Sequence, residues 1–217
     1  MTQQDSHLRR AGVRKGVKAM ALSGVKVGLA VGGSHCNMSR AIATMGELVE
    51  LGADLTPIMS GALMRDTTRF GTPDDWWGAV SRVTGKEPLT EIPEVEPSGP
   101  QHWFDVLLVM PCTGNTMAKI ANAINDSATT MAVKAQLRNA RPVVLAITTN
   151  DALGMNAMNL GRLLACRSIY FVPFGQDNPI VKPRSVDAHL ERVPETLEAA
   201  LEGRQLQPIL MEWRNPA

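Results

Sequence analysis

The sequence has few cysteines and few aromatic residues. Its three cysteines, Cys36, Cys112 and Cys166, are odd in number, lie far apart and form no C-x-x-C motif. This pattern argues against structural disulfides and against a zinc site, so we expect no metal, and it is typical of a reduced cytosolic protein. Aromatic residues make up 4% of the chain, so the base-stacking surfaces of single-strand nucleic-acid binders are scarce.

The chain also lacks a strong charge of either sign and a long apolar run. Its formal net charge is +1, whereas nucleic-acid-binding domains usually carry a clear positive excess. No uninterrupted apolar run approaches the roughly 20 residues that a membrane-spanning helix needs. We therefore expect neither nucleic acid nor a membrane as a partner. A chain of 217 residues buries roughly 70% of its unfolded surface, which favours one domain over two.

The N-terminal segment, residues 1–19, is basic but has no apolar signal core. We expect it to be a flexible basic extension. Met20 directly precedes the first convincing structural element, so we take it as the natural start. Residues 20–211 then form the α/β domain, and residues 212–217 form a C-terminal tail.

Five apolar runs of strand length alternate with helical patterns along the chain. The runs cover residues 25–31, 54–59, 104–110, 143–147 and 168–173, and the turns after them read GGSH, SG, CTGN, TTND and FGQD. Right-handed crossovers between such strands produce a mainly parallel sheet with helices on both faces, a three-layer α/β/α Rossmann-like fold. The carboxyl ends of parallel strands meet at one edge, where open α/β sheets bind ligands. We therefore expect a ligand site along that edge.

Further expectations concern individual segments. Asn115 should cap the helix that follows the third strand. Residues 88–101, which are rich in proline and acidic residues, should form a surface connection with little regular structure. A final helix should span residues 186–201. The methionines, including Met155 and Met158, fall at helical apolar spacing and should fill the core.

Two of the turns carry candidate ligand-binding groups. After the first strand, Gly32 and Gly33 let the backbone approach a ligand closely, and the Ser34 hydroxyl with the nearby amides suits a phosphate. The alternative is that Ser34 only caps a helix. After the third strand, Thr113 and Asn115 suit ligand contact, again with a helix cap as the alternative. The motif is GGS and not G-x-G-x-x-G, so a classical dinucleotide fingerprint is absent.

Four other residues bear reactive groups. His35 follows the glycine turn and can act as an acid or base at the site, or it is simply a surface-loop histidine. Arg69 lies in a loop with no evident packing role, and it suits an anionic substrate. Cys36 and Cys112 both follow predicted strands. A helix N-terminus can activate a thiol there, but a free cysteine usually has a packing role.

Six ordered stretches between residues 20 and 211 carry a family resemblance. They are GSHC (33–36), TRFG (68–71), TGNTMAKIANAINDS (113–127), RPVVLAITTNDALGMN (141–156), YFVPFGQDNP (170–179) and ALEGRQLQPIL (200–210). They resemble the family of flavoprotein-like dipicolinate synthase subunits, those designated B, of the spore dipicolinate pathway. That family is in turn similar to flavin-containing cysteine decarboxylases, which bind FMN in a flavodoxin-like fold and form homotrimers or larger assemblies.

The resemblance implies roles for particular residues. The positions that match the family's FMN contacts are Ser34, Ser60, Asn115 and Thr116, and with Gly33 and Thr113 of the turns they make up the expected FMN-binding residues. His35 and Arg69 become the implied catalytic residues, with Arg69 also holding a substrate carboxylate. The substrate motif P-x-M-N of the decarboxylases is reduced here to Gly154-Met155-Asn156. The missing proline puts cysteine-type decarboxylation in doubt and leaves Asn156 as a substrate-binding candidate.

The implied function is that of one component of a two-subunit oxidoreductase, dipicolinate synthase. It would oxidise 4-hydroxytetrahydrodipicolinate, or dihydrodipicolinate after water loss, to dipicolinate during sporulation, in the cytoplasm of the mother cell. The companion subunit, designated A, would carry NAD(P), in agreement with the absent dinucleotide fingerprint here. The chain would also form a homo-oligomer, a trimer or dodecamer, and bind a small dicarboxylate. The alternative is a non-catalytic scaffold or substrate-binding subunit with a vestigial flavin pocket.

Overall fold

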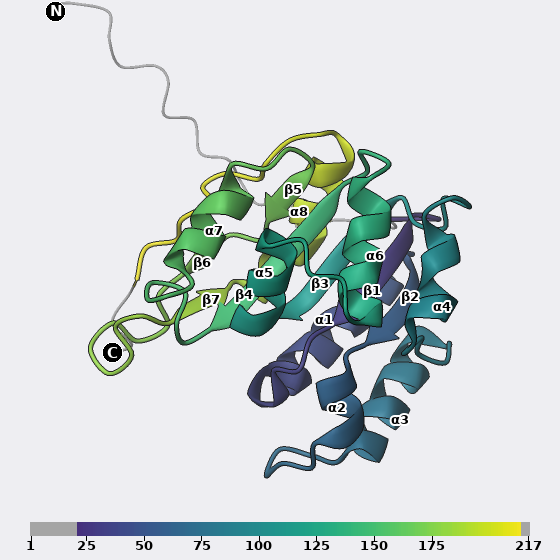
Figure 1. Cartoon of the computed structure of the whole chain (residues 1–217), viewed down its shortest axis with the longest axis horizontal. Coiled ribbons are helices and arrows are strands. Elements are labelled where there is room, and N and C mark those ends of the chain that lie inside the picture. The colour runs from purple at the N-terminus through teal and green to yellow at the C-terminus, as the bar shows by residue number, and fades with distance from the viewer. Residues whose placement is uncertain (1–20, 214–217) are drawn as a thin grey trace, which may run out of the picture.

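The computed structural model describes residues 21–213 of the chain. In this range an open sheet is covered by helices on both faces (Figure 1). The strands are β1 (Lys26–Val31), β2 (Asp54–Met59), β3 (Val106–Cys112), β4 (Val143–Thr149), β5 (Ile169–Phe171), β6 (Phe174–Gly175) and β7 (Val186–Ala188). The α-helices are α1 (Met38–Glu50), α2 (Gly61–Arg65), α3 (Pro73–Thr84), α4 (Ile92–Val95), α5 (Gly114–Ala121), α6 (Ala128–Leu137), α7 (Ala157–Leu164) and α8 (Val193–Leu201). Three short 3₁₀ helices are η1 (His35–Asn37), η2 (Glu96–Ser98) and η3 (Leu190–Arg192).

The sheet is mainly parallel. Strands β2, β1, β3, β4 and β5 lie side by side in that order, each parallel to its neighbour. Near its end, β4 also pairs antiparallel with β7, which pairs antiparallel with β6. From β1 the chain first adds β2 on one side and later adds β3 on the other. This is the strand order of flavodoxin-like folds, with its switch point between β1 and β3.

Alternation along the strands builds two cores. Successive side chains of a strand point to opposite faces. In β3, Val106, Leu108 and Met110 join one cluster with residues of α1, α3 and α8. Leu107 and Val109 join a second cluster with residues of α4, α5, α6 and α7. Because both faces are covered, β3 is apolar without interruption, and the expected three-layer α/β/α fold is confirmed.

Local residues determine where helix α3 begins and ends. The Thr72 hydroxyl accepts a hydrogen bond from the Asp75 amide at 3.2 Å, and the Asp75 carboxylate accepts one from the Thr72 amide at 2.8 Å. This reciprocal pair satisfies amides that the first turn leaves without helical partners. Gly85 ends the helix with a φ of 69°, a conformation that glycine adopts without strain.

Two expectations about chain segments are wrong. Residues 88–101 are not a largely irregular surface connection, since α4 and η2 form there, with Val95 and Ser98 buried. The final helix does not begin at Val186. Residues 186–188 form the antiparallel strand β7, and α8 starts only at Val193. Pro194 sits in the first helical turn, where its missing N–H costs nothing.

The methionines Met155 and Met158 do not fill the core. Their exposed fractions are 81% and 67%, whereas Leu160 and Leu163 of α7 are buried. The expectation is therefore wrong for these two, because Leu160 and Leu163 form the buried side of α7. The expected extension at residues 1–19 and the start at Met20 lie outside the described residues. Among residues 21–213, no helix combines the length and apolar character needed to cross a membrane.

Candidate functional site

The carboxyl ends of β1 and β3 approach each other very closely. A Cβ added to Gly32 would collide with the backbone carbonyl oxygen of Pro111. Neither backbone can yield easily at the centre of a sheet, so the position favours glycine. The turns that follow, with Ser34 after β1 and Thr113 after β3, therefore lie next to the switch point of the sheet.

The turn after β3 is closed by Thr113 and not by Asn115. The Thr113 hydroxyl accepts a hydrogen bond from the Thr116 amide at 3.1 Å, and the two hydroxyls lie 3.0 Å apart. Asn115 is exposed within the first turn of α5. The expectation that Asn115 caps the helix is wrong, because α5 already begins at Gly114 and leaves Thr113 in the capping position.

A cavity of about 780 Å³ opens at this edge of the sheet. It is lined by Gly33, Ser34, His35, Cys36, Asn37, Arg40, Thr68, Phe70, Thr113, Thr148, Thr149, Asn150, Asp177, Lys182, Ser185, Val186 and Asp187. We call it the inner cavity. Its size falls within the range of small-molecule sites, and its lining is rich in hydroxyl and amide groups. Of the predicted site residues, it brings together Gly33, Ser34, His35 and Thr113.

A chain of hydrogen bonds crosses the inner cavity from β1 to β4. Asn37 Nδ2 donates to Ser34 Oγ at 3.2 Å, and Arg40 Nη1 donates to Asn37 Oδ1 at 3.2 Å. Arg40 Nη1 also pairs with Asp187 Oδ2 at 2.6 Å. On the far side, Thr148 Oγ1 donates to Asp187 Oδ1 at 3.1 Å. These contacts fix the Ser34 hydroxyl relative to the wall formed by β4 and β7.

A second ion pair lies on the loop between β6 and β7. Lys182 Nζ is 3.0 Å from Asp177 Oδ2. Burial alone would raise the pKa of Asp177, but hydrogen bonds from Lys182, Ser185 and the Asn178 amide lower it below its usual value. The hydrogen bond to Asp177 in turn raises the pKa of Lys182. Both groups are therefore charged at neutral pH, and the inner cavity contains two cation–carboxylate pairs.

His35 and the two cysteines differ in their surroundings. The His35 ring lies 6.4 Å from the Trp76 ring, and its Nδ1 is buried with no hydrogen-bond partner within residues 21–213. Cys36 is exposed in the lining of the inner cavity. Cys112 is buried in the sheet, and burial raises the pKa of its thiol to about 12. Cys112 thus stays protonated at neutral pH, which suits a packing role.

Ser60, Thr116 and Asn156 lie behind the inner cavity and do not line it. The Ser60 hydroxyl is buried without a hydrogen-bond partner in the described part of the chain. Thr116 is buried beside Thr113. Asn156 donates to Asp151 Oδ2 at 2.7 Å, and Asp151 Oδ1 accepts from Thr149 Oγ1 at 2.6 Å. Asn156 is thus connected to the lining residue Thr149 through Asp151.

Arg69 lies on the outside of the loop that borders the inner cavity. Its neighbours Thr68 and Phe70 line the cavity, whereas Arg69 is exposed. Its guanidinium carbon sits 4.8 Å from the centre of the Phe70 ring, a cation–π contact. Arg69 is therefore not part of the cavity lining that contains Ser34, the residue predicted to bind phosphate.

Sequence reasoning misses the charged residues of the inner cavity. Lys182 lies in the loop between β6 and β7, which carries no apolar pattern, and Asp187 falls in a segment expected to be helical. Arg40 stands outside the apolar pattern of its helix. The one signal for this wall is the turn FGQD, which includes Asp177. Antiparallel pairing of β7 with β4 brings the wall to the site.

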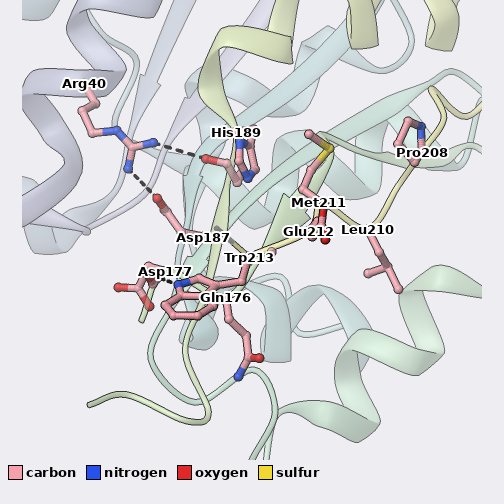
Figure 2. Close-up of a pocket in the computed structure, with 12 residues that line it drawn as sticks. Arg40, Gln176, Asp177, Asp187, His189, Pro208, Leu210, Met211, Glu212 and Trp213 are labelled. Atoms are coloured by element: carbon pink, nitrogen blue, oxygen red, sulfur yellow. Dashed lines mark hydrogen bonds and ion pairs between the residues drawn. The ribbon is translucent and has the colours of Figure 1, made fainter. Parts of the chain in front are cut away.

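A second cavity of about 680 Å³ adjoins the first. We call it the outer cavity. Arg40, Asp177 and Asp187 line both cavities, and residues 208 and 210–213 form the far wall of the outer one. Figure 2 shows Arg40 reaching towards Asp187, with His189 beside them and Trp213 near Asp177. Trp213 Nε1 donates to the carbonyl oxygen of Asp177 at 3.3 Å.

Comparison with known proteins gives consistent matches. The family model described as Flavoprotein matches residues 18–191. The dipicolinate synthase subunit designated B of Bacillus subtilis (strain 168) is 44% identical over 192 residues, which is 88% of this chain and 96% of that protein. The crystal structure of the corresponding subunit from Bacillus halodurans C is 45% identical and superposes with a TM-score of 0.81, covering 88% of this chain and 97% of that one. The predicted resemblance to these flavoprotein-like subunits is confirmed.

A more distant match supports the fold. A dodecameric FMN-dependent UbiX-like decarboxylase from Escherichia coli O157:H7 is 18% identical, with a TM-score of 0.55, over 69% of this chain and 80% of that one. The predicted likeness to flavin-dependent decarboxylases is confirmed at the level of fold.

Proposed function

The chain belongs to the flavoprotein family, and we propose that it acts as the flavoprotein subunit of a dipicolinate synthase. The observation that carries this proposal is the 44% identity to the Bacillus subtilis subunit over 88% of this chain and 96% of that protein. The likeness therefore concerns nearly the whole of that protein and not a single shared motif. The reaction that follows is oxidation of 4-hydroxytetrahydrodipicolinate or dihydrodipicolinate to dipicolinate.

The inner cavity suits FMN. Phosphates bind where backbone amides and hydroxyls gather at the start of a helix, and Ser34 stands directly before η1 and α1. A Cβ on Gly33 would lie 2.8 Å from the Ala62 Cβ and 3.6 Å from the Ser60 hydroxyl. That hydroxyl is buried without a partner among the described residues, directly behind the turn that would hold the phosphate. When bound, FMN supplies a group that accepts or donates a hydride.

The residues that would hold FMN come from three strand ends. Gly33 and Ser34 offer the phosphate-side turn, and Ser60 backs it from the end of β2. On the other side of the switch point, Thr113 offers its hydroxyl, and the start of α5 offers its first amides. Thr116 fixes the orientation of Thr113. Asn115, exposed next to this turn, would contact a ligand that extends beyond the cavity.

His35 is the best-placed group to move a proton. It lines the inner cavity, and its Nδ1 has no hydrogen-bond partner among the described residues. A neutral imidazole nitrogen can accept a proton as a hydrogen leaves the substrate ring. Arg69 and Asn156, the other residues implied by the resemblance, lie outside the lining. They would act from its border and from behind it.

The proposal includes partners. The similar proteins are named as one subunit of a synthase, which implies a companion, and we propose that this companion is the NAD(P)-binding subunit. We also propose a homo-oligomer, a trimer or dodecamer, since an FMN-dependent protein of the same fold is dodecameric. The cytoplasm of the mother cell of a spore-forming bacterium is the proposed location.

Reconstitution with the NAD(P)-binding subunit tests the function. The two purified subunits are mixed with NAD(P) and with freshly generated 4-hydroxytetrahydrodipicolinate, and dipicolinate is measured by its ultraviolet absorbance. We expect dipicolinate to form with both subunits and not when this chain is left out. Formation at the same rate without this chain would contradict a catalytic contribution and favour the scaffold alternative. No formation with both subunits would contradict the proposed function.

A further inference from the structure

The two cavities meet at a group of charged side chains. Arg40, Asp177 and Asp187 line both cavities. Figure 2 shows that Arg40 enters from α1 and points at Asp187 on β7. The junction is therefore a place where a ligand in one cavity and a ligand in the other would come into contact.

Two cations face the inner cavity near this junction, Arg40 at the junction itself and Lys182 in the lining of the inner cavity alone. Within residues 21–213, Arg40 and Lys182 are the arginine and lysine side chains in its lining. Lys182 is held by Asp177, and the negative charge of Asp187 adds to the rise in its pKa. Since Asp187 is also the partner of Arg40, one carboxylate lies within electrostatic reach of both cations. The two cations thus approach the junction from different elements.

Both cations have N–H groups that donate to none of the described residues. A guanidinium has five N–H donors and an ammonium has three. Among the described residues, Arg40 donates to Asn37, Asp187 and Ala188, and Lys182 donates to Asp177. About two donors therefore remain on each group. A dicarboxylate has two oxygens at each end, which matches one end to each cation.

We propose that Arg40 and Lys182 bind the two carboxylates of the dicarboxylate substrate, at the junction of the inner and outer cavities. This inference rests on the proposed function, since it names the residues that recognise its substrate. Asp187 and Asp177 keep their bonds to Arg40 and Lys182 and so hold each cation in place. Hydroxyl and amide groups of the lining, including Ser185 and Asn150, add neutral donors.

The assignment differs from the one implied by the family resemblance. Arg69 is exposed and stacked against Phe70, outside the lining. To reach a ligand in the cavity it would have to leave the Phe70 ring and turn inward. Arg40 needs no such movement, because its hydrogen bonds already aim it at the junction.

Equilibrium binding to the FMN-loaded protein tests the inference. Dipicolinate and its monocarboxylate analogue picolinate are titrated into wild type, Arg40→Gln and Lys182→Met by calorimetry. We expect each substitution to weaken dipicolinate binding at least about tenfold, or about 1.4 kcal/mol. Each should also reduce the preference for dipicolinate over picolinate. Only dipicolinate has a second carboxylate, so only dipicolinate gains from the presence of both cations. Arg82→Gln, which changes an exposed residue of α3, is the matched control.

The outcomes separate the inference from the function. A far-ultraviolet circular dichroism spectrum and a melting temperature close to those of wild type show that each variant has folded. Dipicolinate affinity and preference equal to wild type in both variants would overturn the inference. Arg69→Gln is titrated in the same way, and a loss of affinity in that variant alone would also overturn it. If wild type forms dipicolinate in the reconstituted synthase, the proposed function survives that result. If wild type neither forms nor binds dipicolinate, the proposed function fails and the inference falls with it.

Discussion

Arg40 on α1 and Asp187 on β7 form an ion pair at 2.6 Å, between positions 147 residues apart in the sequence. The two side chains are 48% and 24% exposed. Exposed pairs contribute about 0–1 kcal/mol to stability, so this contact matters more for position than for stability. It fixes the wall that the two cavities share.

A double-mutant cycle measures how much the Arg40–Asp187 pair contributes to stability. Arg40→Ala, Asp187→Ala and the double variant are unfolded with urea, and the coupling free energy is derived from the three stability changes. We expect a coupling below about 1 kcal/mol, and a decrease at high salt because solvent ions screen exposed charges. A coupling of several kcal/mol that salt leaves unchanged would show that the pair stabilises the fold.

The contact between Gly32 and Pro111 predicts a cost for a single methyl group. In Gly32→Ala the new Cβ must push apart the ends of β1 and β3, so we expect a stability loss of about 1–3 kcal/mol. Weaker FMN binding should accompany it. Gly46→Ala is the matched control, since a Cβ there meets no atom within 4 Å. It lies inside α1 and should gain about 0.5–1 kcal/mol from helix propensity. Chemical unfolding shows whether each variant gains or loses stability. Equal stability changes in Gly32→Ala and Gly46→Ala would contradict the close approach of β1 and β3 at Gly32.

Thiol reactivity should follow burial. Cys36 and Cys166 are exposed, and Cys112 is buried with a pKa of about 12. Iodoacetamide reacts with thiolates, so under mildly alkaline conditions we expect native protein to be modified at Cys36 and Cys166 but not at Cys112. Peptide mass spectrometry gives the sites, and unfolded protein should be modified at all three. Rapid modification of native Cys112 would contradict its packing role.

The Asp177–Lys182 pair predicts a pH dependence of stability. The pKa of Asp177 is lowered in the folded protein, so its contribution is fully present above its unfolded value of about 3.9. That contribution is lost as the pH falls through the lower, folded pKa. The stability advantage of wild type over Asp177→Asn should thus be constant at about pH 5–7 and shrink below about pH 4. Thermal unfolding across this range measures it, and an advantage that grows in acid would contradict the pairing.

The parallel part of the sheet is predictable from the sequence. Strands buried on both faces are continuous apolar runs, and the turns after them are small and polar. Thr72, Asp75 and Gly85 likewise mark α3 by local chemistry that needs no tertiary contact. Because the carboxyl ends of parallel strands meet at one edge of the sheet, the turns that hold Ser34 and Thr113 can also be placed there.

Tertiary contacts explain what the sequence does not reveal. Residues 186–188 become a strand because the end of β4 offers backbone partners, and three residues carry no periodicity of their own. Arg40 and Lys182 look like ordinary surface residues until β7 brings Asp187 to the cavity. Arg69 is the opposite case, since a loop position beside lining residues says nothing about which way its side chain points.

A flavin titration tests the central claim, that the inner cavity binds FMN with its phosphate at Ser34. FMN and riboflavin are titrated into wild type, Ser34→Glu and Ser39→Glu, an exposed α1 control with the same charge change. We predict that wild type binds FMN, that Ser34→Glu weakens FMN at least about tenfold because like charges repel, and that riboflavin, which lacks the phosphate, is affected far less. Ser39→Glu should bind as wild type does. Wild type that binds no FMN, or Ser34→Glu that binds it as tightly, would contradict the claim.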